Sequence, residues 1–516
     1  MAPPAQTRTT VFVGSVNLVA QIADKLFSFG QIIVIAAFLG ATPEADLLFL
    51  ASIAPLTIGY VVGEPVGRAF LTLLVRERDQ AAGRRLAASA FVLTGTALLL
   101  VTALYAVVAC ILVTIFTPGG SGDLVPWIVL SLIAPFAGIA GLLSGMLLWL
   151  HDYAWAAARV PIASAGGLIL VALAAYTSGH LAWIGVSLVL SYAIAGVLMY
   201  ARVAKHLGLG WGLATSTADL REASRVKSLV IGPSVGGAIG GQVIVTIERL
   251  LAGGIVGTGA VAIISYARGI GTAPTVLAQA VGAASYPRVV RAEAAADTGF
   301  LRESFIRGLR LAIFFGAACL VFLTLFGPAA VSAVLERGKF NVATADETGK
   351  VLVAFAAATF TGSLIAYLVP FIYGLNRFRA IIWLELAIFS VYVVAGPTGA
   401  IVGGLVGLAI GFAIAQAAGV VAGLEVCRRA LEIGWGRIVR EAIAPVIAPV
   451  LSVSAVVVAY RLLVDHVSPP IAYRGVIRAG GGGVVLVLGI AAVLLLSPLP
   501  EADQLRRGLR RLFRSE

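Results

Sequence analysis

The feature that most constrains this chain is a series of long apolar segments with charged residues inside several of them. Segments of about 18 or more mostly apolar residues recur from end to end, and each can cross roughly 30 Å of hydrocarbon. Only 12% of the 516 residues are charged, against about 25% in soluble globular proteins. The short alternating segments of a transmembrane β-barrel do not appear in the sequence. The sequence therefore predicts an all-α, polytopic membrane protein.

The apolar pattern predicts about 14 transmembrane helices. They cover residues 10–39, 45–74, 86–116, 124–150, 155–177, 181–204, 226–253, 258–286, 305–335, 345–374, 378–396, 398–426, 440–463 and 474–497.

The distribution of lysine and arginine predicts the orientation in the membrane. Alternate connectors are rich in these residues, around 76–85, 202–227, 288–310, 377–379 and 428–437. The intervening connectors are poor in them, with exceptions at Arg337, Lys339, Lys350 and Arg474. By the positive-inside rule we expect both termini in the cytoplasm. The tail spaces leucines among arginines and predicts an amphipathic helix on the inner leaflet.

Charge and motif content exclude several functions. The net charge of +12 resides in short connectors, so we expect no nucleic-acid partner. The three cysteines have neither disulfide-framework nor metal-site spacing. Histidines are scattered, and the sequence contains neither an HExxH nor a P-loop motif. We therefore expect neither an enzyme nor a bound cofactor or metal.

Two parts of the chain resemble each other. Asp24-Lys25 followed by Pro55 is echoed by Glu248-Arg249 followed by Pro274. This echo predicts two parallel six-helix repeats with a site between them. The predicted domains are an N-lobe (1–205), a cytoplasmic linker (206–225), a C-lobe (226–430), two further spans (431–498) and a cytoplasmic tail (499–516).

Charged residues within the spans are the strongest functional signal. Each costs at least about 2.5–3.5 kcal/mol to insert, so it is usually paired or faces an aqueous cavity. The candidates are Asp24, Lys25, Glu64, Arg68, Glu248, Arg249, Arg268 and Glu385. Most lie in spans 1, 2, 7 and 8. Structural ion pairs are one interpretation. Alternatively the cationic side chains bind an anionic phosphate headgroup, or the acidic ones bind protons or sodium.

Several motifs in order resemble one family. They are Phe38-Leu-Gly-Ala-Thr-Pro-Glu-Ala-Asp46, Pro55, Gly63-Glu64, Ala69-Phe70, Tyr266-Ala267-Arg268 with Pro274, Tyr286-Pro287-Arg288, Arg337-Gly338-Lys339-Phe340 and Phe371-Ile-Tyr-Gly374. Together they resemble the MurJ/MviN lipid II flippases of the multidrug/oligosaccharidyl-lipid/polysaccharide flippase superfamily. The resemblance runs from the first span to about the eleventh.

The resemblance implies two six-helix lobes around a cationic cavity, and a groove from the last two spans for a lipid tail. It implies that alternating access moves a polyprenyl-diphosphate glycan from the inner to the outer leaflet. Our hypothesis is that the diphosphate is held by Lys25, Arg68, Arg249 and Arg268. The further candidate binding residues are Asp24, Glu64, Glu248 and Asp46. Membrane lipids and cell-envelope synthesis proteins are the other expected partners.

The sequence departs from the family pattern. The two arginines of the family's first span correspond here to Lys25 and Gln31, and the arginine of its second span falls near Gly59. Lipid II or a different polyprenyl-linked glycan therefore fits the sequence. Two other classes stay open: a cation-coupled drug antiporter of the same superfamily, and a non-transporting scaffold for cell-wall synthesis. The coupling to membrane potential, sodium or protons is also open.

Overall fold

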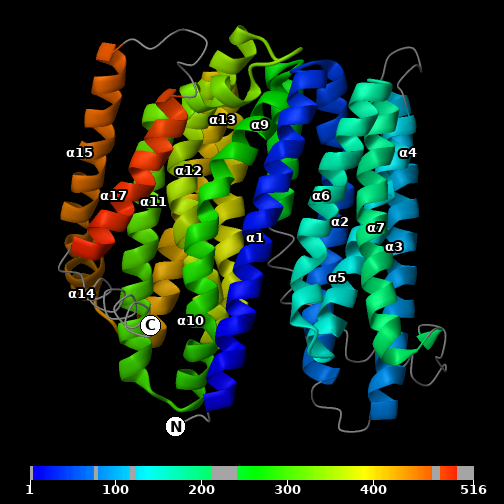
Figure 1. Ribbon diagram of the computed structural model, residues 1–516, viewed down its shortest axis with the longest axis horizontal. Helices are drawn as coiled ribbons and strands as arrows, with labels where there is room; N and C mark the ends of the chain where they lie inside the picture. Colours follow the sequence, from blue (N-terminus) through cyan, green and yellow to red (C-terminus); the bar gives the residue numbers. More distant parts are fainter. Residues whose placement is uncertain are drawn as a thin grey trace, which may run out of the picture. The chain divides into compact units, whose positions relative to one another are not determined.

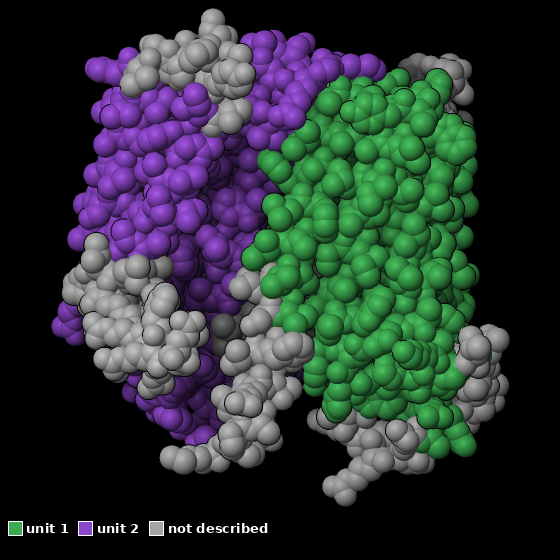
Figure 2. Space-filling model, in the orientation of Figure 1, with its two compact units in different colours: residues 1–253 green, residues 254–516 purple. Residues whose placement is uncertain are grey.

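The computed structural model is helical throughout its regular structure and divides into two compact units (Figures 1 and 2). It describes residues 4–74, 80–116, 124–208, 210–211, 241–467 and 477–496, and no strand occurs among these residues. The first unit comprises residues 1–253 and the second unit residues 254–516. The predicted linker (206–225) falls mostly outside the described residues, and the predicted tail (499–516) does so entirely.

The first unit is a bundle of long helices. They are α1 (Pro4–Leu39), α2 (Pro43–Leu74), α3 (Gln80–Phe116), α4 (Val125–Ser131), α5 (Ile133–Trp149), α6 (Tyr153–Thr177), α7 (Leu181–Leu207) and a helical segment at 241–251. Helices α1 and α7 both pack against α6, while α2 packs against α5. α4 and α5 together cover the predicted span 124–150, with a break at Leu132.

The second unit is arranged around α12. Its elements are α9 (Ala260–Thr272), η3 (Ala273–Thr275), α10 (Val276–Ala294), α11 (Thr298–Leu335), α12 (Val342–Gly374), α13 (Phe378–Leu431), α14 (Trp435–Ile438), η4 (Val439–Ile443), α15 (Ala444–Val467), η5 (Ile477–Gly481) and α17 (Gly482–Leu496). Helices α9, α10, α11 and α13 pack against α12. α15 and α17 pack against α11 through an apolar cluster that includes Phe314, Phe326 and Val453.

The predicted membrane protein is confirmed by the helices themselves. Within the described residues, 11 helices are long and apolar enough to cross a membrane, and a shorter apolar helix covers Ile477–Val493. One of the 11 is α13, whose 54 residues contain two predicted spans. The chain is therefore a multi-pass helical membrane protein.

The turn between those two spans lies elsewhere than predicted. The sequence placed it near Pro397, but Pro397 lies inside the helix, and the backbone leaves helical geometry at Gly403 and Gly404. Gly404 has φ 57° and ψ −136°, a conformation that essentially only glycine adopts. The predicted boundary lies too early in the chain, because a membrane helix tolerates proline and the turn needs the conformational freedom of glycine.

The end of the predicted seventh span groups with the first unit. The sequence assigned residues 226–253 to the C-lobe, and residues 241–253 belong to the first unit. Two contacts tie this segment to α2. Thr57 Oγ1 donates to Gln242 Oε1 at 3.4 Å, and Arg249 Nη1 donates to the Phe49 carbonyl at 2.8 Å. The remaining lobe boundaries stay a prediction.

An ion-pair cluster joins the turn between α5 and α6 to the C-terminal part of α7. Asp152, in the turn between α5 and α6, accepts a 2.6 Å hydrogen bond from Arg202 Nε and lies 3.3 Å from His206 Nε2. The Arg202 guanidinium also lies 5.5 Å from the centre of the Trp155 ring. Burial raises the pKa of the Asp152 carboxyl, but the hydrogen bonds from Arg202 and His206 outweigh burial and lower it overall.

Asp152→Asn is expected to lower the melting temperature by roughly 3–6 °C at pH 7, because Arg202 loses its charged partner. A carboxyl whose pKa is lowered on folding stabilises the protein above its unfolded pKa of about 3.9 and loses that contribution as pH falls through the folded pKa. The difference between wild type and variant should therefore be largest above about pH 5 and shrink below about pH 4. Thermal unfolding of the purified protein between these pH values measures it.

Asp346→Asn is the matched control. Asp346 forms a 2.6 Å pair with Lys350, and both side chains are more than half exposed. An exposed i,i+4 pair contributes about 0.3–0.5 kcal/mol, so this variant should melt within roughly 2 °C of wild type at every pH. An Asp152→Asn deficit that persisted unchanged at low pH would assign the effect to something other than the ionised carboxylate.

Candidate functional site: a polar cavity in the first unit

A polar cavity lies among four helices of the first unit. Its volume is about 350 Å³. The lining residues are Asp24, Lys25, Ser28 and Gln31 of α1, Tyr60 of α2, Arg159, Val160, Ala163 and Ser164 of α6, and Ser191 and Tyr192 of α7. The α1 residues recur every three to four positions, which places them on one face of the helix. Nine of the 11 lining side chains are polar, inside a bundle whose helices are otherwise apolar.

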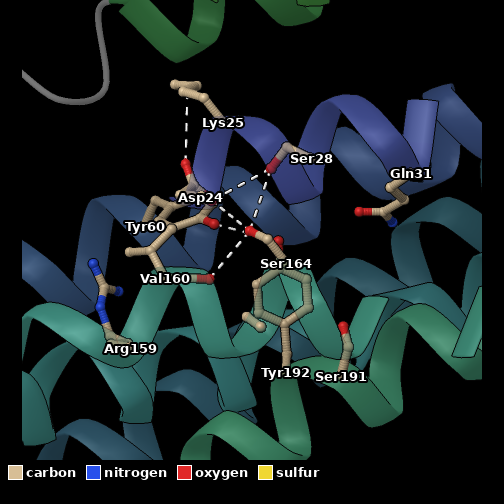
Figure 3. A pocket seen from close by; sticks show the side chains of 11 residues that line it. Asp24, Lys25, Ser28, Gln31, Tyr60, Arg159, Val160, Ser164, Ser191 and Tyr192 are labelled. Atoms are coloured by element: carbon tan, nitrogen blue, oxygen red, sulfur yellow. Dashed lines mark hydrogen bonds and ion pairs between the residues drawn. The ribbon is translucent and has the colours of Figure 1, made fainter. Parts of the chain in front are cut away.

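Asp24 is the centre of the hydrogen-bond network in this cavity (Figure 3). Its Oδ1 accepts hydrogen bonds from the hydroxyls of Ser164 and of Ser28, the latter at 3.3 Å. The two serine hydroxyls lie 3.2 Å apart and join α1 to α6. Lys25 Nζ lies 3.8 Å from the other carboxylate oxygen, and its side chain is 45% exposed against 15% for Asp24. The carboxylate is thus anchored while the ammonium remains accessible.

The rest of the cavity lining carries mainly hydroxyl and amide groups. The hydroxyls of Tyr60 and Tyr192 lie 3.3 Å apart, and their rings meet edge to face with centroids 6.5 Å apart. Ser191 is buried and donates to the Leu188 carbonyl at 2.7 Å. Among the described residues the Gln31 side-chain amide forms no hydrogen bond. Arg159 is 8% exposed.

Polar groups in a membrane bundle have to be satisfied internally or hydrated in a cavity. The hydrogen-bond network satisfies some of these polar groups internally. Ser164, for example, also donates to the Val160 carbonyl one turn earlier, at 3.1 Å. The lining offers donors, acceptors and both signs of charge. This combination can bind a polar or charged ligand reversibly.

Of the predicted site residues, the cavity contains Asp24 and Lys25. Asp46 instead lies in the first turn of α2, buried, where a carboxylate stabilises the positive end of the helix dipole. Glu248 is 1% exposed in the segment 241–251. The Arg249 guanidinium donates to the Phe49 carbonyl and lies 5.7 Å from the Phe49 ring centre. Glu64 and Arg68 belong to α2, but their side chains lie outside the described residues.

Arg268 belongs to the second unit, and its guanidinium packs against two aromatic rings. Its guanidinium carbon lies 4.2 Å from the Phe412 ring centre and 5.2 Å from that of Phe355. A cation over an aromatic face gains up to about 2 kcal/mol when it is desolvated. Phe355 comes from α12 and Phe412 from the second arm of α13. These contacts hold the guanidinium of α9 against α12 and α13.

Sequence reasoning missed most of the cavity lining. Arg159 could have been found, because it is a charged residue inside the predicted span 155–177, which is the signal that identified Asp24. Gln31 was noted only as the position of a family arginine. Ser28, Ser164, Tyr60 and Tyr192 gave no signal, since hydroxyl residues are common in membrane helices.

Membrane-spanning helices in two units, with a polar cavity inside one bundle, define the class of helical membrane transporters. Within that class the chain belongs to the MurJ family, since the family profile described as lipid II flippase MurJ matches residues 35–469. The family predicted from the sequence motifs is therefore confirmed.

Solved structures share the fold. A structure titled lipid II flippase MurJ in an inward closed conformation aligns with a TM-score of 0.72 and 13% identity, over 92% of this chain and 98% of that one. An inward-facing multidrug resistance MATE transporter aligns with a TM-score of 0.66 and 15% identity, over 81% of this chain and 98% of that one. A MOP superfamily transporter from Pyrococcus furiosus aligns with a TM-score of 0.61 and 16% identity, over 82% of this chain and 95% of that one. No curated protein sequence matches the chain.

Proposed function

We propose that this chain is a flippase. It moves a polyprenyl-diphosphate-linked glycan, lipid II or a related cell-envelope precursor, from the inner to the outer leaflet of a bacterial inner membrane. The observation that carries the proposal is the family match over residues 35–469. The polar cavity inside the first unit supports it, since a headgroup crossing a bilayer needs a hydrated path.

The transport cycle needs no covalent chemistry. The headgroup enters a hydrated site while the polyprenyl chain stays in lipid, and alternating access then exposes the headgroup to the other side. Arg268 is the cation that best fits the diphosphate, because its guanidinium packs against two aromatic rings. Lys25, which lines the cavity 3.8 Å from the Asp24 carboxylate, stays a predicted contact of the headgroup. Arg249 bonds a backbone carbonyl, which favours a structural contribution to holding segment 241–251 on α2. Arg68 keeps its proposed role as a diphosphate ligand.

The energy source in this proposal is an electrochemical gradient. A membrane potential contributes about 2.3 kcal/mol per charge per 100 mV, which would favour moving an anionic headgroup outward across a potential that is negative inside. A sodium or proton gradient acting on the acidic residues is the alternative source. The lysine- and arginine-rich connectors support cytoplasmic termini, so the headgroup would enter from the side that carries both termini.

A second candidate is a cation-coupled antiporter for drugs or other small molecules. It is favoured by one observation, the carboxylate of Asp24 at the centre of the cavity, and by the fold shared with MATE transporters. An antiporter of this kind needs an acidic group that alternately binds and releases a cation. The Lys25 ammonium, 3.8 Å from that carboxylate, makes the site less anionic than this function needs.

Complementation tests the proposal. Expressed in a bacterium depleted of its own lipid II flippase, the chain should restore growth and deliver lipid-linked precursor to the outer leaflet at least about tenfold above an empty vector. Precursor reaching the outer leaflet is measured with an impermeant labelling reagent, and membrane insertion is checked in the same cells. Resistance to cationic drugs under an imposed ion gradient, with no lipid-linked glycan moved or co-purified, would instead establish the antiporter.

A further inference from the structure

We propose that the cavity of the first unit is a subsite for one neutral sugar ring of the transported lipid, and that the diphosphate binds elsewhere. This inference rests on the proposed flippase function and assigns one part of the substrate to one place. The argument comes from the charge balance of the lining, the hydrogen-bonding groups it presents, and its size.

The charge balance disfavours a diphosphate in this cavity. Three charged side chains line it, the cations Lys25 and Arg159 and the carboxylate of Asp24, so the formal sum is 2 − 1 = +1. Asp24 lies at the centre, held by Ser28 and Ser164 from two helices. A diphosphate placed among these groups would bring its negative charges next to a fixed carboxylate in a medium of low dielectric constant. A neutral ligand avoids that repulsion.

The hydrogen-bonding groups match a sugar better than a phosphate. Six neutral polar side chains share the lining: Ser28, Gln31, Tyr60, Ser164, Ser191 and Tyr192. Hydroxyl and amide groups both donate and accept, as sugar hydroxyls and acetamido groups do, whereas phosphate oxygens only accept. The Gln31 amide has no hydrogen-bond partner among the described residues and lines the cavity (Figure 3), where an acetamido group could pair with it through two hydrogen bonds.

The size of the cavity sets how much of the glycan it takes. Ligand sites in proteins range from about 300 to 1,000 Å³. At about 350 Å³ this cavity is near the lower limit and suits one ring, with the rest of the headgroup outside. The edge-to-face pair of Tyr60 and Tyr192 supplies aromatic surface with two hydroxyls close together. One ring carrying hydroxyl or acetamido groups fills and satisfies such a site.

The test compares two lipids on the full-length protein in lipid nanodiscs. One probe is polyprenyl diphosphate, and the other is polyprenyl diphosphate bearing one N-acetylhexosamine. Binding is titrated by native mass spectrometry. Wild type should bind the sugar-bearing lipid about tenfold more tightly, which corresponds to one or two hydrogen bonds. The double variant Gln31→Ala with Tyr192→Phe should reduce this preference to less than about threefold and leave binding of bare polyprenyl diphosphate unchanged.

Two further variants make the result specific. Tyr200→Phe is the matched control, because Tyr200 lies on α7 like Tyr192 but packs on Trp211 and Phe91 outside the cavity. It should keep the tenfold preference. Ser164→Ala removes a hydroxyl of the lining that donates to Asp24, and it replaces the double variant if the latter fails to fold. It should likewise reduce the preference for the sugar-bearing lipid and leave binding of bare polyprenyl diphosphate unchanged.

The outcomes separate the inference from the proposed function. Wild type binding both lipids equally would overturn the sugar subsite and leave the flippase proposal standing. A double variant that lost both lipids in equal measure would place the diphosphate in the cavity and also overturn it. If wild type bound neither lipid while Asp24→Asn abolished uptake of sodium or protons, the flippase proposal and the inference would both fail.

Discussion

Gly63→Leu is expected to lower the melting temperature of the purified protein by roughly 6–12 °C. A Cβ atom at Gly63 would lie 2.4 Å from the Gly138 carbonyl oxygen and 2.6 Å from its Cα. These are backbone atoms of α5, so they move only if the whole helix moves. Overpacking of this kind costs about 3 kcal/mol, and each kcal/mol corresponds to about 2–4 °C in a unit of this size.

The close approach extends along both helices. A Cβ at Gly145 would lie 2.6 Å from the Gly67 carbonyl oxygen, and one at Gly67 would lie 2.9 Å from the Gly141 carbonyl oxygen. Small residues at four-residue spacing allow such contact between membrane helices, where packing replaces the hydrophobic effect as the stabilising force. Because α2 also carries Tyr60, separating it from α5 should disturb the cavity as well as the bundle.

Gly95→Leu is the matched control for this prediction. Gly95 is a glycine inside α3, and a Cβ there would meet nothing within 4 Å. Leucine is the better helix former by roughly 0.8 kcal/mol, so this variant should melt at or slightly above the wild-type temperature. Thermal unfolding of the three proteins in one detergent measures the difference. Equal melting temperatures for the two variants would show that α2 and α5 do not pack through Gly63.

The sequence predicted the class of fold because insertion energy is a strong constraint. Apolar length alone identified the spans, and the cost of a charge in hydrocarbon singled out Asp24 and Lys25, which the structure places at the cavity. The family motifs then predicted the relationship that the profile match confirms.

The contacts that the sequence did not reveal are made between residues far apart in the chain, which no local sequence pattern encodes. The spacing of Gly59 and Gly63 is common by chance, and its meaning appears only because Gly138 and Ala137 of α5 lie opposite. The cavity hydroxyls come from helices far apart in the chain, such as Ser28 and Ser164. Arg249 occupies the position in the repeat that corresponds to Lys25, yet its guanidinium donates a hydrogen bond to a backbone carbonyl of α2. In each case tertiary packing, and not residue type, decides the role.

The largest expected effect on transport belongs to Arg268. Arg268→Gln should slow translocation of the lipid-linked glycan at least about tenfold, because a charge-assisted contact to phosphate contributes about 1.5–3 kcal/mol. The ring centres of Phe355 and Phe412 lie 5.2 Å and 4.2 Å from the central carbon of the guanidinium. Arg268→Lys keeps the charge but loses the planar fork, so we expect it to restore only part of the rate.

The measurement is the initial rate in vesicles reconstituted with the full chain, normalised to the protein incorporated, together with the melting temperature of each variant. Arg429→Gln is the control, since Arg429 is 75% exposed and pairs with Glu425. Its rate should equal that of wild type. The competing interpretation is that Arg268 only joins α9 to α12 and α13. In that case Arg268→Gln would lower the melting temperature while the rate per folded protein stayed unchanged, and the diphosphate would have to be held by other cations.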